Sequence, residues 1–113
     1  MVKNDFTRLR HMLEAAEASI EFIKGKRRKE LENNRMLCFA VIRALEIVGE
    51  AASQITKSFQ SKHPEIQWRA IVGMRNRLIH AYFNIDYDIV WQAVRHEIPQ
   101  LIKDLENILN NIE

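Results

Sequence analysis

One stretch decides the fold: residues 37–59 read LCFAVIRALEIVGEAASQITKSF, with apolar side chains that recur at spacings of three and four. This period places them on one wide face of an α-helix, and a face of that width indicates a helix at the centre of a bundle. Gly49, Ala51 and Ala52 are small, so the backbone of a neighbouring helix could come close to them. We therefore expect a central helix over residues 34–61.

The segment before this helix shows the same period. Apolar residues within 5–24 form the stripe of an amphipathic helix, and Gly25 is placed to end it. Residues 26–34 predict a short further helical turn, with a break or cap at Asn33 and Asn34. The N-terminal part is thus expected to pack as one long helix against the central one.

The segment after it predicts two more helical passes. Pro64 separates the central helix from one expected over residues 66–83. Asp86 is a suitable N-cap for a last helix that starts near residue 87, and Pro99 should kink or restart that helix. The sequence therefore predicts an all-α, antiparallel bundle of four or five helices.

Composition agrees with a helical protein built as one domain over residues 1–113. The chain is 47% hydrophobic and 28% charged, and three glycines and two prolines are too few for an all-β chain with many tight turns. Cys38 is the single cysteine, which excludes an internal disulfide and favours a reducing, cytoplasmic setting. No apolar run approaches the length of a membrane span, and the first residues lack the apolar region of a signal peptide.

The net charge of +2 is too small to identify a nucleic-acid-binding protein, but the basic residues are unevenly placed. A nearly continuous basic run, interrupted by Gly25, comprises Lys24, Lys26, Arg27, Arg28 and Lys29. Such a run could meet phosphates or an acidic partner, or it could be a solvated loop between helices.

Trp68 and Trp91 are expected as core or interface anchors, with base stacking as the alternative for one of them.

The richest chemistry lies at residues 74–82, which read MRNRLIHAY. On a continuous helix Asn76 and His80 are i,i+4 neighbours, so the amide could orient the imidazole, with Arg75 and Tyr82 to one side. Metal-free cleavage of RNA needs a base for the 2′-hydroxyl, an acid for the leaving 5′-oxygen and a cation for the phosphorane. Histidine suits both proton transfers, and arginine offers forked donors that match phosphate oxygens.

The spacing alone does not specify catalysis, because an Arg-x4-His pair on a helix is usually just surface. One histidine also cannot easily be base and acid together, whereas a two-fold dimer would place a second Arg75 and His80 across the same groove. In this arrangement His80 is the acid or base, Arg75 the phosphate clamp and Asn76 the orienting residue.

These residues lie in a longer pattern: LEIVGEA at 45–51, WRAIVGMRN at 68–76 and HAYF at 80–83. The pattern resembles HEPN-fold ribonucleases, in particular HepT-like toxins. The resemblance implies a homodimeric RNase toxin without a cofactor, paired with an antitoxin of the minimal nucleotidyltransferase fold (MntA-like). It further implies that this antitoxin transfers AMP to the motif tyrosine, here Tyr82, which would block RNA by bulk and charge. The rival interpretation is a non-catalytic HEPN module that binds nucleotide or serves a nucleotidyltransferase.

Several other residues are weaker candidates. Glu50 could orient Arg75 or Asn76, or it could belong to a solvated or dimer-facing polar stripe. Arg69 and Arg77 flank the motif and are reasonable contacts for the RNA backbone. The four histidines are scattered, so no metal site is expected. Whether the RNA target is tRNA or mRNA is left open by the sequence.

Overall fold

A computed structural model describes residues 3–81 and 84–112, with the side chains of all these residues except 3, 79–81 and 112. Helices dominate, and one short strand pair interrupts them. The elements in chain order are α1 (Lys3–Ile23), α2 (Arg28–Asn33), α3 (Arg35–Ser53), α4 (Lys57–Lys62), α5 (Trp68–Val72), α6 (Met74–Leu78), β1 (Ile79–Ala81), β2 (Asn84–Ile85), α7 (Tyr87–Gln92), the π-helical η1 (Ala93–Glu97) and α8 (Ile98–Ile112).

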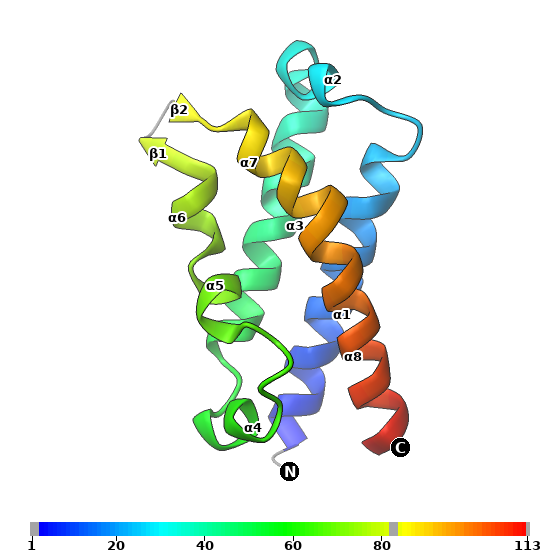
Figure 1. Cartoon of the computed structure of the whole chain (residues 1–113), viewed down its shortest axis with the longest axis vertical. Coiled ribbons are helices and arrows are strands. Elements are labelled where there is room, and N and C mark those ends of the chain that lie inside the picture. Colours follow the sequence, from blue (N-terminus) through cyan, green and yellow to red (C-terminus); the bar gives the residue numbers. More distant parts are fainter. Residues whose placement is uncertain (1–2, 82–83, 113) are drawn as a thin grey trace.

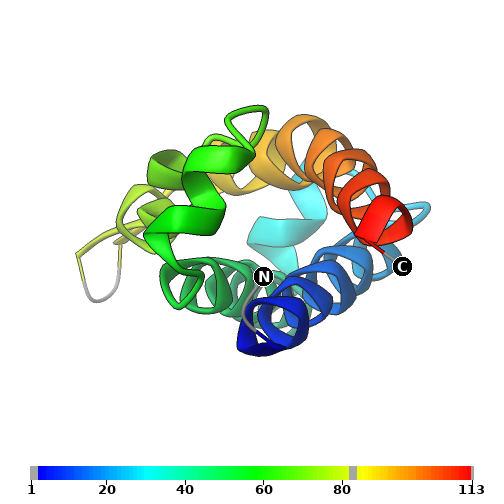
Figure 2. The ribbon, with the colours of Figure 1, turned by 90° about the horizontal axis from the view of Figure 1, so that it is seen from below.

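The chain runs alternately up and down the bundle in four passes: α1, α3, α5 with α6, and α7 with η1 and α8 (Figure 1). Viewed along the long axis, α1 and α3 form one layer, and the other two passes form the second (Figure 2). Both chain ends lie at one end of the bundle, whereas the β1–β2 hairpin and α2 lie at the other (Figure 1). The predicted all-α antiparallel bundle is confirmed.

The core fills the space between these layers. Apolar side chains from every pass are excluded from solvent, because burial of each contributes about 1.5–3 kcal/mol. The largest fully buried ones are Leu9, Met12, Leu31, Val41, Leu45, Val48, Met74, Leu78, Val90, Val94, Ile98 and Leu105.

The expected boundaries around α1 and α2 are confirmed. Gly25 follows the end of α1 with a φ of 74°, a left-handed conformation that glycine adopts without strain. Asn34 ends the short α2 and caps α3, with its side-chain oxygen accepting a hydrogen bond from the Leu37 amide at 3.0 Å.

The expected continuous helix over residues 34–61 is wrong at residues 54–56, because α3 ends at Ser53 and α4 starts after Thr56. The buried Asp5 of α1 accepts hydrogen bonds from the Thr56 amide at 3.0 Å and the Thr56 hydroxyl at 2.8 Å. The Thr56 hydroxyl in turn caps α4 by accepting from Phe59 N–H at 3.3 Å. A contact between residues 51 positions apart, which periodicity cannot reveal, thus stops the helix.

The expected helix over residues 66–83 is also wrong, since it is broken at Gly73 and ends at Leu78. The next residues form β1, which pairs antiparallel with β2 through Ile79 opposite Ile85 and Ala81 opposite Asn84. The Asp86 amide donates to the Leu78 carbonyl at 3.0 Å. In a longer helix this carbonyl would accept from the amide four residues on, so the hairpin replaces that helical hydrogen bond. Strand pairing therefore replaces the last helical turn.

The last pass starts as expected, with the Asp86 side chain accepting from the Ile89 amide at 3.1 Å. Pro99 does not restart the helix: the helical path continues from α7 through η1 into α8. Proline lacks an N–H, so the Arg95 carbonyl loses its usual donor four residues on. The chain adapts by the wider π-helical turn of η1, in which Ile98 N–H donates to the Ala93 carbonyl.

Candidate active site

The structure divides the motif between two elements. Arg75, Asn76 and Arg77 lie on α6, whereas His80 lies on β1, and its side chain is not among those described. Tyr82 lies outside the described residues. The expected helical i,i+4 relation between Asn76 and His80 is therefore wrong. The helix α6 has five residues and ends at Leu78, before it reaches His80.

The buried face of α6 fixes which motif residues are exposed. Met74 and Leu78, one helical turn apart, are fully buried and anchor α6 to the core. Arg75 and Asn76 consequently lie on the exposed side. The local sequence thus presents a guanidinium and an amide to solvent from a firmly anchored turn.

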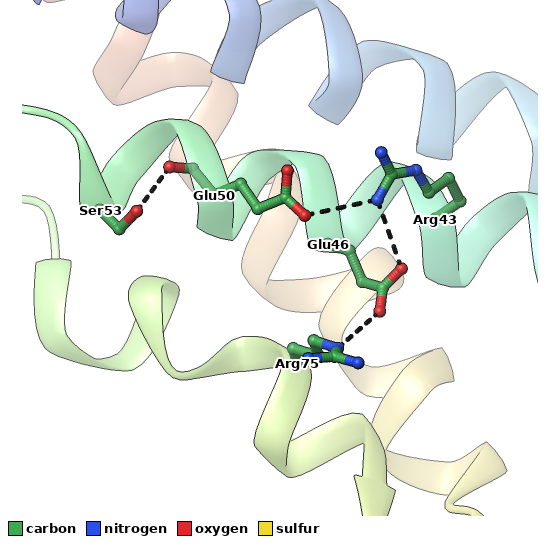
Figure 3. A network of polar contacts seen from close by, with 5 residues as sticks. All are labelled: Arg43, Glu46, Glu50, Ser53 and Arg75. Atoms are coloured by element: carbon green, nitrogen blue, oxygen red, sulfur yellow. Dashed lines mark hydrogen bonds and ion pairs between the residues drawn. The ribbon is translucent and has the colours of Figure 1, made fainter. Parts of the chain in front are cut away.

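Arg75 is held by a carboxylate of the other layer (Figure 3). Its Nε donates to Glu46 Oε2 of α3 at 2.9 Å. The Glu46 side chain is only 17% exposed, whereas that of Arg75 is 72% exposed. In this ion pair the carboxylate is therefore largely buried and the guanidinium is accessible to a ligand. No other contact within the described part of the chain uses the Arg75 guanidinium, which leaves its two terminal nitrogens available for a phosphate.

Glu50 does not contact Arg75 or Asn76 in the described part of the chain. It accepts a hydrogen bond from Arg43 Nη1 at 3.4 Å, and Arg43 also lies 3.7 Å from Glu46 Oε1 (Figure 3). Glu50 thus joins the network one step away, and Glu46 holds the supporting place that the sequence analysis offered to Glu50. Helical spacing could have named Glu46 as a second candidate, because it lies one turn before Glu50 on the same polar stripe.

A glycine sets the distance between the two layers at this point. A Cβ atom added to Gly49 of α3 would lie 3.0 Å from the Ile71 carbonyl oxygen and 3.5 Å from that of Val72. The expectation that small residues on this helix allow close approach of a neighbouring backbone is confirmed. Close approach of α5 brings the start of α6 within reach of Glu46.

The two flanking arginines differ. Arg77 donates from Nη1 and Nη2 to the two oxygens of Glu97 at 3.2 and 2.8 Å, which ties α6 to η1. This half-buried, bidentate pair favours a structural role for Arg77 over the expected RNA contact. Arg69 is exposed on α5 and lines an open cavity of about 680 Å³. Its expected contact with the RNA backbone stays a prediction.

A second cavity, of about 340 Å³, lies beside the hairpin. Its wall includes Ile85 of β2, Arg35 and Phe39 of α3, and Tyr87 of α7. An arginine and two aromatic rings are side chains that can contact a phosphate and a base. The hairpin that carries His80 thus adjoins a cavity with suitable chemistry for a nucleotide.

Two features are absent from the part of the chain that the structure describes. Among them no group of three or more His, Cys, Asp or Glu side chains is placed to hold a metal ion. In the same part of the chain, no helix combines the length and apolar character needed to cross a membrane.

Comparison with known proteins places the chain in a family. The family model for HepT-like ribonucleases matches residues 12–108. A Methanocaldococcus jannaschii protein named "Putative RNase MJ1380" is 46% identical over 95 residues, which cover 84% of this chain and 87% of the relative. A Thermococcus cleftensis protein named "Probable ribonuclease HepT" is 41% identical over 100 residues, covering 88% and 91%. No solved structure gives a significant match. The chain belongs to the HepT-like ribonuclease family.

Proposed function

We propose that this protein is a metal-independent endoribonuclease and the toxin of a toxin–antitoxin pair that acts on cytoplasmic RNA. The observation that carries the proposal is the exposed Arg75 guanidinium, fixed through Nε to Glu46 and open at its other two nitrogens. The names of the relatives and the family membership support ribonuclease chemistry. Arg75 is separated from His80 by four residues, and the hairpin keeps that histidine next to α6.

In the proposed reaction the 2′-oxygen attacks the adjacent phosphorus and the bond from phosphorus to the 5′-oxygen breaks. One His80 takes the proton of the 2′-hydroxyl, and a second, protonated His80 gives a proton to the departing 5′-oxygen. Arg75 neutralises the charge that builds up on the phosphorane, and Asn76 orients the histidine. The products are a 2′,3′-cyclic phosphate and a 5′-hydroxyl, so protons and charge balance without a cofactor.

The second His80 comes from a second copy of the chain in a homodimer. The exposed face of α3 supports this part of the proposal. Along it, Met36 and Phe39 are 81% and 57% exposed, and Arg43, Glu46 and Glu50 continue the same stripe at spacings of three and four. Large exposed apolar side chains next to the Arg75 network suit a two-fold interface that brings two sites together.

Control by the antitoxin is proposed to act on Tyr82. The phenolic oxygen attacks the α-phosphorus of ATP on a minimal nucleotidyltransferase, pyrophosphate leaves and the phenolic proton is released. The resulting AMP ester adds a negative phosphate two residues from His80, where it competes with RNA for Arg75. Family membership supports this step.

The activity is tested by incubating the purified protein with RNA in EDTA. We expect cleavage to 2′,3′-cyclic phosphate ends, and a fall of about 100-fold or more for Arg75→Ala and for His80→Ala with unchanged melting temperatures. Intact RNA under every condition would favour the non-catalytic HEPN module, and activity that EDTA removes would overturn the metal-free reaction. Induced expression in bacteria gives the cellular readout, with the two variants harmless and the wild type toxic.

The control step has its own test. After co-expression with a cognate nucleotidyltransferase, mass spectrometry should find AMP-sized additions on Tyr82 in the wild type and none at this position in Tyr82→Phe. Neutralisation of toxicity without any such addition would overturn the modification and leave binding as the antitoxin's mechanism.

A further inference from the structure

A strongly basic groove lies apart from the Arg75 network. It has a volume of about 700 Å³ and runs between the end of α1, the loop before α2 and the start of the η1–α8 pass. Five cations line it, against Glu21 as the one acidic residue of its lining. The cations are Lys24, Lys26, Arg27, Arg28 and Arg95.

The loop that carries most of this charge is held in place. Arg28 of α2 forms an ion pair with Asp88 of α7, and its Nη1 donates to Glu32 at 2.7 Å. These contacts fasten the loop before α2 against α7. Arg28 is therefore the structural member of the basic run, and the cations before it project from a fixed loop.

The remaining cations of the loop are available to a ligand. Lys24, Lys26 and Arg27 are exposed, and within the described residues none of their side chains has an ion pair. Three adjacent cations without carboxylate partners repel one another, and an anion with repeated charges would relieve that repulsion.

An aromatic ring completes the groove. Trp91 of α7 lies in its lining, and the Arg95 guanidinium lies over the indole at 5.8 Å from the ring centroid. Cations that follow a backbone together with an aromatic ring for a base are the usual elements of single-strand binding. Trp91 thus favours RNA over a purely acidic protein surface.

The helix α7 connects the hairpin that carries His80 with the groove. Trp91 lies five residues beyond Asp86, which is about 7.5 Å along a helix axis. The hairpin and the loop before α2 lie at the same end of the bundle, on opposite sides of it, with α7 running between them (Figure 1). A strand that is cut at the hairpin can therefore continue along α7 into the groove.

We propose that this groove is an accessory site for single-stranded RNA, in which Lys24, Lys26 and Arg27 pair with phosphates and Trp91 stacks on a base. The proposal rests on the proposed ribonuclease function and extends the substrate beyond the nucleotides at the cleaved bond. It predicts that long RNA binds better than a dinucleotide, and that the difference comes from this groove.

Binding is measured by fluorescence anisotropy with a single-stranded RNA of about 12 nucleotides, in a His80→Ala background that keeps the RNA intact. The groove variant is Lys24→Gln/Lys26→Gln/Arg27→Gln. Its matched control, with the same change in charge, is Lys57→Gln/Lys62→Gln/Lys103→Gln on exposed residues elsewhere. We expect the groove variant to lose about tenfold or more in affinity and its log–log salt slope to fall by about 2, with the control within about twofold of the parent.

The aromatic contact has a separate pair of variants. Trp91→Leu keeps an apolar side chain but removes the stacking surface, and should weaken binding by about tenfold, whereas Trp91→Phe should stay near the parent. Equal losses in the groove variant and its control would overturn the proposal. So would an unchanged RNA affinity of the groove variant together with weaker binding of the cognate nucleotidyltransferase, which would make this a protein-binding site.

Failure here is distinguishable from failure of the ribonuclease proposal. If the wild type cleaves RNA and the groove variant binds and cleaves the long RNA equally well, only the groove proposal fails. If the wild type cleaves nothing but the groove variant still loses RNA affinity, the groove proposal stands and the ribonuclease proposal fails.

Discussion

The two layers of the bundle are built differently. In the first, α1 and α3 are unbroken helices of 21 and 19 residues. In the second, the pass from α5 to β2 consists of two five-residue helices and a short strand pair. Apart from the end of α3, the first layer follows from hydrophobic period and local caps, whereas this part of the second depends on contacts with its neighbours.

This difference matters because the proposed catalytic residues all lie in the irregular pass, and the regular layer positions them. Glu46 holds Arg75, and Gly49 allows α5 to approach α3. The long helix α3 therefore acts as the fixed surface from which the geometry of the motif is set. Mutations that act on α3 should show how far the second layer depends on it.

The largest effect is expected from Gly49→Ala. The new methyl group would meet the Ile71 carbonyl oxygen at 3.0 Å, and backbone cannot move as a side-chain tip can. Overpacking of this kind costs about 1–3 kcal/mol, which outweighs the gain of up to about 1 kcal/mol in helix propensity. Thermal unfolding should show a melting temperature lower by several degrees, and RNA cleavage should fall as α6 moves away from Glu46.

Gly73→Ala is the matched control, since its Cβ would meet its nearest atom, the Arg69 carbonyl oxygen, at the milder distance of 3.3 Å. A Gly73→Ala variant that is destabilised as much as Gly49→Ala would show that the layer contact is not special.

The contrast between the two layers also separates the helix boundaries that the sequence could predict from those that it could not. Periodicity, Gly25 and the Asn34 and Asp86 caps placed the long helices, because these signals act within a few residues. The break at Thr56 and the strand after Leu78 were missed, because Asp5 and the hairpin act on them from elsewhere in the fold. Local signals therefore predict the start of a helix more reliably than its end, because tertiary contacts can stop a helix.

The candidate site divides in the same way. Residue types singled out Arg75 and its family pattern, because the forked donors of arginine suit a phosphate whatever the fold. Its partner, Glu46, lies 29 positions earlier and could not be chosen over Glu50 by spacing, since both share one face of α3. The ion pair between Arg77 and Glu97, 20 positions apart, likewise could not be read from the sequence.

The second prediction sets Glu46→Gln against Glu50→Gln. Glu46→Gln removes the charge that holds Arg75, so the guanidinium loses its fixed orientation and cleavage should fall by about tenfold, mostly in kcat. Glu50→Gln changes the same charge on the same helix one turn away and should stay within about twofold. Steady-state cleavage of a short RNA distinguishes them, and a Glu50→Gln defect as large as that of Glu46→Gln would return the supporting role to Glu50.

The third prediction concerns the pair that ties α6 to η1. Arg77→Gln breaks a half-buried, bidentate ion pair and should lower the free energy of unfolding by about 0.5–1 kcal/mol. RNA affinity should be unchanged, because the Arg77 guanidinium is already engaged by Glu97.

The exposed Arg69 offers the opposite test: Arg69→Gln should leave denaturant unfolding unchanged and weaken RNA binding. An Arg77→Gln variant with normal stability and weaker RNA binding would reverse these two assignments.

The smallest effect should come from Cys38, which belongs to the regular layer. Burial raises the pKa of its thiol above the ordinary value. A group with a raised folded pKa contributes its full stabilisation below the unfolded pKa, and this stabilisation is lost as the pH rises through the folded pKa. The stability difference between wild type and Cys38→Ala should therefore shrink as the pH is raised from neutral into the alkaline range. The same shrinkage should occur in the Gly49→Ala background, because Gly49 lies about three turns along α3 from Cys38. A flat difference there would mean that the disturbance at Gly49 spreads along α3 to Cys38.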